Sequence, residues 1–161
     1  MNYQTVLSKA TKILKNQLIK NPKLDCEILL SNALKIEREK LLINLNQEIN
    51  EKELNNFNNL INRRKKKEPI AYIIGYKEFW KKKFKVNTNV LIPRPDTEHL
   101  VEEALKVIPN NSSLNILDIG TGSGCIILSI LRERNKCHGV ALDISKKALN
   151  VAKYNAKIQQ I

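Results

Sequence analysis

Apolar residues recur every three or four positions along the first 67 residues, which is the spacing of one face of an α-helix. Three such faces are present, one within residues 6–18, one after Asn21 and one after Asn50. Asn21 is followed by proline, and Asn50 is followed by Glu53 at the spacing of a capping box, so both are typical of helix starts. The pattern predicts a small helical bundle over residues 1–67.

The helical spacing stops in residues 68–95, where three prolines and one glycine fall among short apolar runs. The runs Glu78–Trp80 and Phe84–Val86 flank a stretch of lysines and are expected to pair as a hairpin. Residues 68–95 are therefore predicted to be a linker that contains a β-hairpin.

Residues 96–161 alternate between helix-like and strand-like patterns. A helix opens at Asp96, and the elements after it are a buried-type strand, a helix, a strand and a helix, over residues 114–119, 125–134, 139–142 and 145–156. Strands that alternate with helices form parallel sheets with right-handed crossovers. The predicted fold class is α + α/β, a helical bundle followed by the start of a Rossmann-like domain with an incomplete parallel sheet.

Composition excludes several classes of protein. The 161 residues carry 28 Lys and Arg against 16 Asp and Glu, and this net charge of +12 favours acidic partners but is spread evenly over both halves of the chain. Three cysteines without a C-x-x-C pair, and two histidines without ligand spacing, argue against a disulfide scaffold or a metal site. No apolar run approaches the ~20 residues of a membrane span, and the N-terminus lacks the features of a signal peptide. We expect a cytoplasmic protein with reduced thiols, no metal and no membrane contact.

The most informative motif lies in residues 116–125. A predicted strand runs through Asp118 into a loop with glycine at positions 120, 122 and 124, and a helix begins at Cys125. Glycine lets a ligand approach the backbone closely, and the N–H groups that open the helix add hydrogen-bond donors. The spacing differs from the G-x-G-x-x-G of dinucleotide-binding loops, and the chain contains no P-loop.

Two acidic residues flank this glycine loop and indicate its ligand. Asp118 suits an ammonium group, and Asp143, which ends the second strand, is placed to accept hydrogen bonds from both hydroxyls of a ribose. A ligand with an ammonium group and a free ribose is S-adenosylmethionine. The candidate cofactor-binding residues are Asp118, Gly120, Thr121, Gly122, Ser123, Gly124 and Asp143. In the alternative interpretation, the glycines form only a tight turn and Asp143 is a helix cap.

A basic cluster occupies residues 63–85, which hold ten Lys or Arg, two Glu and three interleaved Phe or Trp residues. Such a composition allows a weak contact with RNA or the ribosome, in which lysines bind phosphates and an aromatic ring stacks on a base. The alternative, which we favour, is a solvated helix end followed by a hairpin whose aromatic rings pack inward.

Further motifs surround the glycine loop in a fixed order. They are Pro69–Gly75, Glu78-Phe79, Phe84–Val86, Leu91–Glu98, Ile116–Gly124 and Ala141–Ser145. In this order they resemble the peptide chain release factor glutamine methyltransferases of the HemK-like family. The Pro-Arg-Pro-Asp-Thr-Glu sequence of residues 93–98 is the most specific part, and the helical bundle fits the family as well, so the resemblance covers the whole chain.

The resemblance implies an enzyme that transfers the methyl group of S-adenosylmethionine to the side-chain amide nitrogen of the glutamine in the Gly-Gly-Gln motif of translation release factors. It further implies that residues 120–124 wrap the methionine part of the cofactor, that Asp118 holds its ammonium group, and that Asp143 holds its ribose. The bundle of residues 1–67 is expected to recognise the release factor. Arg94 is a candidate for the substrate side, and the alternative for Arg94 is a surface salt bridge or a contact with a helix end.

The family's catalytic motif, Asn-Pro-Pro-Tyr, does not occur in the 161 residues. We therefore expect residues 96–161 to be a truncated S-adenosylmethionine-binding domain, without catalytic residues, and the chain to be inactive alone. The alternative function is a non-catalytic nucleic-acid-binding or ribosome-binding module with a degenerate methyltransferase fold.

Overall fold

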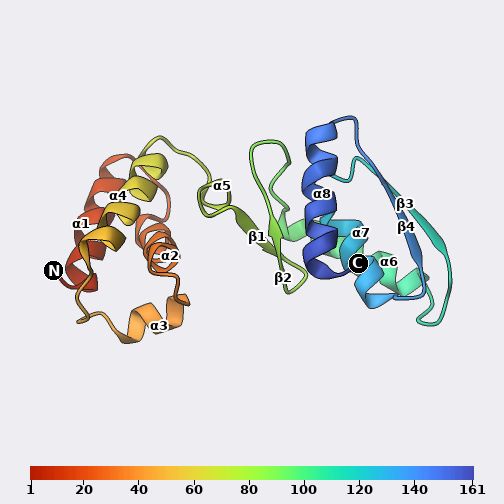
Figure 1. Ribbon diagram of the computed structural model, residues 1–161, viewed down its shortest axis with the longest axis horizontal. Coiled ribbons are helices and arrows are strands. Elements are labelled where there is room, and N and C mark those ends of the chain that lie inside the picture. The colour runs from red at the N-terminus through yellow and green to blue at the C-terminus, as the bar shows by residue number, and fades with distance from the viewer. The chain divides into compact units, whose positions relative to one another are not determined.

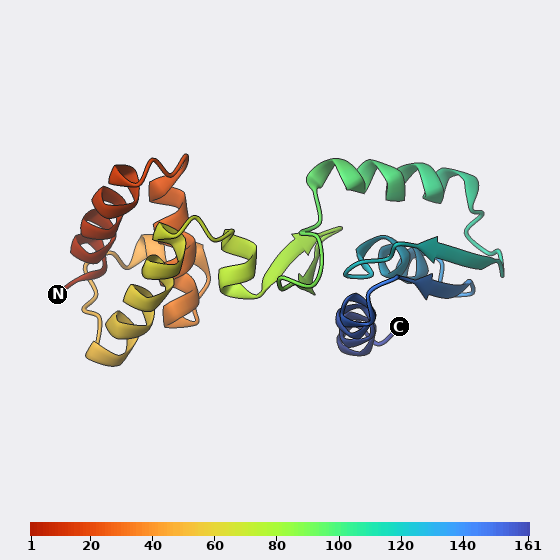
Figure 2. The same cartoon turned by 90° about the horizontal axis from the view of Figure 1, so that it is seen from above.

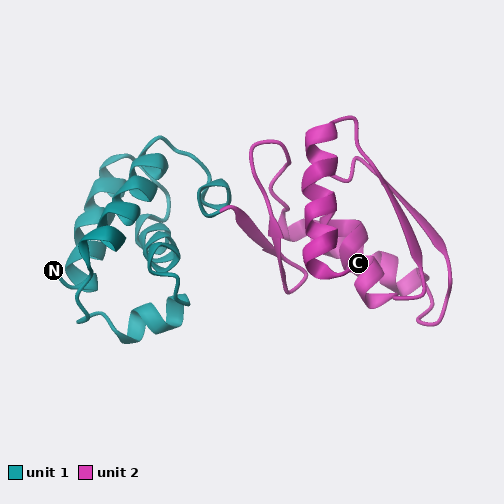
Figure 3. Cartoon of the chain, in the orientation of Figure 1, with its two compact units in different colours: residues 1–74 teal, residues 75–161 magenta.

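The computed structural model describes residues 1–161, which divide into two compact units, residues 1–74 and residues 75–161 (Figure 3). The boundary falls inside the stretch 68–95 that the sequence predicts as a linker. Residues up to Ile74 belong to the first unit, and the hairpin belongs to the second.

The first unit is a bundle of helices (Figure 1). Its elements are α1 (Tyr3–Asn16), α2 (Pro22–Leu34), α3 (Arg38–Ile43), α4 (Glu51–Lys65) and α5 (Ile70–Ile74). Its core is apolar and includes the wholly buried side chains of Leu14, Leu29, Leu30 and Leu41. The helical bundle expected from the apolar spacing is confirmed.

The helix starts of this unit differ in what holds them. Asn50 and Glu53 form the predicted capping box at the start of α4, with the Glu53 N–H donating to Asn50 Oδ1 at 2.8 Å. Asn21 precedes α2 as predicted, but its side chain makes no capping hydrogen bond. The start of α2 therefore depends on Pro22, whose ring fixes a helical φ and whose missing N–H needs no partner there.

The second unit begins with an antiparallel hairpin of β1 (Tyr76–Phe79) and β2 (Lys82–Lys85). The predicted hairpin is confirmed, but the lysine run lies partly in the second strand, because only Trp80 and Lys81 form the turn. Both turn residues have positive φ, 48° and 60°. Two-residue turns of this kind match the right-handed twist of paired strands. The turn is held from outside the hairpin, since the Trp80 N–H donates to Glu98 and Arg132 donates to the Trp80 carbonyl, at 2.9 and 3.0 Å.

The rest of the second unit alternates between helices and strands. Its elements are η1 (Pro95–Thr97), α6 (Glu98–Val107), β3 (Asn115–Ile119), α7 (Cys125–Glu133), β4 (His138–Leu142) and α8 (Lys146–Gln159). β3 and β4 are parallel and run side by side in both views (Figures 1 and 2). This order confirms the predicted start of a Rossmann-like domain.

The two-stranded parallel sheet has one covered face and one exposed face. α7 contacts both strands, and Ile116 and Ala141 face the core that α7 builds with Phe79 and Phe84. The alternate residues are exposed on the other face and are Leu117, Ile119, Val140 and Leu142. The apolar strand expected at residues 114–119 is present as β3, and because helices cover only one side of this incomplete sheet, only one of its faces is buried.

None of the helices is both long and apolar enough to cross a membrane. No three His, Cys, Asp or Glu side chains come together as a set of metal ligands. The three cysteines are buried and free of disulfide bonds.

Candidate cofactor-binding site

The glycine loop leaves the sheet where the two parallel strands end together. Ile119 of β3 is paired in register with Leu142 of β4. The backbone N–H groups of Gly120 and Thr121 both donate to the Leu142 carbonyl, each at 2.9 Å. The loop therefore starts at the carboxyl ends of both strands, which is where ligands bind in open parallel sheets.

Three glycines give this loop its path. Gly120, Gly122 and Gly124 have φ values of 80°, 55° and 79°, a region that costs side-chain-bearing residues energy. An added Cβ at Gly120 or Gly122 would meet no atom within 4 Å, so the backbone there borders open space. A Cβ at Gly124 would instead lie 3.1 Å from Leu128 Cδ1 and 3.3 Å from Ala152 Cβ. The first two glycines leave room for a ligand, and the third permits close packing of α7 and α8.

Asp118 lies on β3, two residues before the loop, and its carboxylate is held by the loop itself. The Thr121 hydroxyl donates to Asp118 Oδ2 at 2.7 Å, and Thr121 is buried. Asp118 is partly exposed. The arrangement fixes one carboxylate oxygen and leaves the other without a hydrogen bond from the chain, so it can accept from an ammonium group.

Asp143 follows β4 and joins that strand's end to the loop after β3. Gly122 N–H donates to Asp143 Oδ2, and Ser145 N–H donates to Asp143 Oδ1, both at 2.9 Å. The N–H groups of Ser145 and Gly122 hold the pKa of the Asp143 carboxyl below its usual range. Ser145 is the residue that caps α8, through a hydrogen bond from Ala148 N–H to its hydroxyl. The alternative of Asp143 as the helix cap is therefore wrong, because Ser145 has that role.

Asn155 of α8, which is not among the candidate residues found from the sequence, also holds the glycine loop. Its side chain is wholly buried, and its Nδ2 donates to the Ser123 carbonyl at 2.8 Å. Ser123 is itself buried between the two glycines. The sequence does contain a signal for this residue, since Asn155 continues the apolar stripe of Ala148, Val151 and Ala152 and is a polar residue on the buried face.

Arg94 is exposed and lies between two prolines at the start of η1. Its guanidinium forms no hydrogen bond and no ion pair, so the alternative of a surface salt bridge is not what the structure shows. The structure also places no bond between Arg94 and the glycine loop. Arg94 therefore has a side chain available to a partner.

The basic cluster of residues 63–85 is divided between the two units, and several of its members have structural roles. Arg63 pairs with Glu68, and Arg64 donates to the buried Asp25 at 2.7 Å. Phe79 and Phe84 are buried and pack edge to face with ring centroids 6.0 Å apart. These two rings face the core, as the favoured interpretation expects, and are not free to stack on bases.

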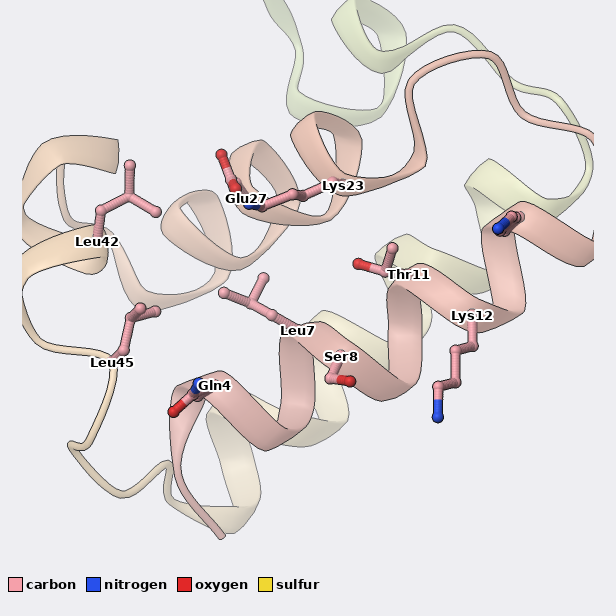
Figure 4. Close-up of a pocket in the computed structure, with 10 residues that line it drawn as sticks. Gln4, Leu7, Ser8, Thr11, Lys12, Lys23, Glu27, Leu42 and Leu45 are labelled. Carbon is pink, nitrogen blue, oxygen red and sulfur yellow. The ribbon is translucent and has the colours of Figure 1, made fainter.

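The helical unit has a pocket of its own, of about 490 Å³ (Figure 4). It is lined by Gln4, Leu7, Ser8, Thr11, Lys12, Lys15, Lys23, Glu27, Leu42 and Leu45. Leu42 and Leu45 lie at the left of the view, and the side chain of Leu7 points toward them, so this is the more apolar end of the pocket. Glu27, the one acidic residue of the lining, is paired with Arg38 at 2.6 Å. The pocket therefore combines an apolar end with three lysines and no unpaired carboxylate.

Comparison with known proteins identifies relatives of both units. Residues 5–75 match the family described as PrmC N-terminal domain, and residues 110–161 match the family described as methyltransferase domain. A release factor glutamine methyltransferase of Leptospira interrogans is 44% identical over 153 residues, which are 94% of this chain and 54% of the relative. The one from Coxiella burnetii is 44% identical over 158 residues, 96% of this chain and 57% of the relative.

A longer protein of Rickettsia conorii is named bifunctional methyltransferase. It is 41% identical over an alignment of 175 residues, gaps included, which covers 94% of this chain and 33% of the relative. The chain spans about half the length of the release factor glutamine methyltransferases that it matches.

Proposed function

The chain corresponds to the N-terminal portion of the release factor glutamine methyltransferase family, and from this premise we propose what the protein does. It binds S-adenosylmethionine and takes part in transferring the methyl group to the side-chain amide nitrogen of the glutamine in the Gly-Gly-Gln motif of release factors. The single observation that carries the proposal is the glycine loop, which borders open space and is flanked by two carboxylates. A protein that acts on release factors works in the cytoplasm.

The residues of the loop fit this cofactor. Asp118 accepts a hydrogen bond from the ammonium group of the methionine part, with the carboxylate oriented by Thr121. Asp143 accepts from the ribose hydroxyls while its backbone donors keep it ionised. The part of the cofactor between the ammonium group and the ribose lies against the open backbone at Gly120 and Gly122. S-adenosylmethionine supplies, when bound, a methyl group on a positively charged sulfur, so a weak nucleophile such as an amide nitrogen reacts if it is held in line.

The residues that would orient the glutamine belong, by the family resemblance, to an Asn-Pro-Pro-Tyr motif that these 161 residues do not contain. We therefore propose that the chain provides the cofactor side of the site and that it does not methylate a release factor by itself. Longer proteins of the family would add the orienting residues.

We further propose that the helical unit recognises the release factor through the pocket between α1, α2 and α3. Its apolar end and its three lysines complement a segment that carries both apolar and acidic side chains. Figure 4 shows that these groups come from both neighbouring helices, α1 and α2, and from the residues of and after α3. No observation favours the alternative of a nucleic-acid-binding module.

Two measurements test the proposed function. Isothermal titration with S-adenosylhomocysteine should show binding to the chain, and an assay with radiolabelled S-adenosylmethionine and a purified release factor should show no methylation by the chain alone. Methylation by the chain alone contradicts the proposal that the chain provides only the cofactor side of the site. Absence of binding both in this chain and in a version extended with the C-terminal half of a longer relative contradicts the cofactor.

A further inference from the structure

Both polar atoms of the Asn155 side-chain amide form hydrogen bonds inside the protein, three in all. Oδ1 accepts from Lys85 N–H at 2.8 Å, and Nδ2 donates to the Lys85 carbonyl at 3.1 Å and to the Ser123 carbonyl at 2.8 Å. One residue of α8 therefore connects the last residue of β2 to the middle of the glycine loop. The partners are 70 and 32 positions away along the chain.

We propose that Asn155 is a positioning residue of the cofactor site, through which the β-hairpin fixes the shape of the glycine loop. The proposal rests on the proposed function, because it assigns a role within the same site. It adds the hairpin of residues 76–85 to the parts on which cofactor binding depends.

The peptide that Asn155 holds is the one that joins Ser123 to Gly124. Its carbonyl accepts from Asn155, and its N–H donates to the Thr121 carbonyl at 2.8 Å. The residues on either side, Gly122 and Gly124, both have positive φ. Glycine has many alternative conformations, so this path needs outside restraint to be populated. Asp143 restrains the Gly122 N–H from the β4 side, and Asn155 restrains the Ser123–Gly124 peptide from the α8 side.

The hairpin is a firm support for this restraint. Asn155 pairs with both the N–H and the carbonyl of Lys85, as a neighbouring strand would. Lys85 Nζ also lies 4.0 Å from the ring centroid of Tyr154, which precedes Asn155 on α8. At the other end of the hairpin, the turn is fixed by Glu98 and Arg132. Movement of the hairpin is therefore resisted at both ends.

The chemistry of the site requires asparagine. Aspartate has the same shape but no amide protons, so it offers no donor to either carbonyl when it is ionised. Alanine and serine are too short to reach both partners. In each case, the Lys85 and Ser123 carbonyls lose the donor that Asn155 provides, and the loss at Ser123 falls in a buried contact, where an unpaired polar group is costly.

The test compares Asn155→Ala and Asn155→Ser with Asn150→Ala, a matched control on an exposed position of the same helix. Backbone NMR of the 161-residue chain without ligand should show the order parameters of the Gly122 and Gly124 amides falling from about 0.85 to below about 0.6 in the Asn155 variants only. Titration with S-adenosylhomocysteine should show affinity at least about tenfold weaker for the same variants. Folded Asn155 variants with unchanged loop order overturn the proposal.

Two further outcomes are decided by the same experiment. If the wild-type chain and its extended form do not bind S-adenosylhomocysteine, the proposed function fails, and the loop order still decides the positioning role. If both Asn155 variants unfold, the proposal is tested by hydrogen exchange in the wild-type chain. The two side-chain amide protons of Asn155 should then exchange with solvent slowly. Fast exchange of these protons overturns the proposal.

Discussion

The Gly122 N–H donates to Asp143 Oδ2 at 2.9 Å, so the carboxylate that follows β4 holds the loop that follows β3. This bond joins two segments that are 21 residues apart and that the parallel pairing of β3 and β4 brings together. The same carboxylate is the proposed acceptor for the ribose. Loop shape and the proposed recognition of the ribose therefore depend on one ionised group.

Replacing Asp143 with asparagine should weaken the binding of S-adenosylhomocysteine by about tenfold or more, because a neutral amide accepts hydrogen bonds less strongly than a carboxylate. Hydrogen exchange at the Gly122 amide should become faster in the same variant. Calorimetry and exchange mass spectrometry measure the two effects. Glu102→Gln, an equivalent change at an exposed position of α6, is the control. Equal affinity for Asp143→Asn and wild type would remove Asp143 from the site.

Alanine substitutions at the three glycines should show which glycines leave room for the ligand and which one is needed for helix packing. All three carry the strain of positive φ, which costs about 1 kcal/mol. Gly124→Ala should lower the free energy of unfolding most, because its Cβ meets Leu128 and Ala152. Gly120→Ala and Gly122→Ala should lose more affinity for S-adenosylhomocysteine than their stability loss explains. Urea unfolding and calorimetry on the same samples check this order, and a Gly124→Ala protein more stable than the other two contradicts it.

Local signals in the sequence predict most of the fold. The helices of the first unit follow from apolar spacing, and the capping box of Asn50 and Glu53 involves residues only three positions apart. The glycine loop and Asp143 follow from a general rule about strand ends, so the sequence places them at one edge of the sheet.

The features that the sequence does not predict depend on distant residues. The hairpin turn at Trp80 and Lys81 contains no glycine, and its position depends on contacts with Glu98 and Arg132. Asn155 holds Ser123 and Lys85, which are far away in the chain, and nothing in the local pattern identifies these partners.

Replacing Lys81 with glycine should stabilise the second unit, since Lys81 has a φ of 60° in the turn. Glycine adopts this conformation without the steric cost, and we expect a gain of about 0.5–1 kcal/mol in the free energy of unfolding. Lys82→Gly is the matched control, because Lys82 lies in β2, where glycine weakens a strand. Urea unfolding measures both variants. A Lys81→Gly protein that is less stable than wild type contradicts the turn geometry.

The thiol of Cys26 should make the first unit less stable in alkaline solution. Burial, chiefly, raises its pKa from 9.0 to about 11, and nearby Asp25 and Glu27 add to the effect. The unfolded chain releases this proton at a lower pH than the folded chain does. The contribution is therefore complete below pH 9 and is lost as the pH rises through about 11. Unfolding by urea between these pH values should show a steeper fall for wild type than for Cys26→Ala, and parallel curves contradict the prediction.

Replacing Arg94 with alanine should affect partner binding without affecting stability. The Arg94 guanidinium is exposed and forms no bond within the chain, whereas Arg134 donates to the carbonyls of Leu105 and Ile108 at 2.7 and 2.8 Å. Arg94→Ala should keep the wild-type Tm and weaken the binding of a purified release factor by about tenfold, as expected for one lost charge-assisted hydrogen bond. Arg134→Ala should lower the Tm, because it leaves two carbonyls at the end of α6 without their donors. Calorimetric melts and surface plasmon resonance measure the two properties. If Arg94→Ala binds the release factor with wild-type affinity, Arg94 has no role in partner binding.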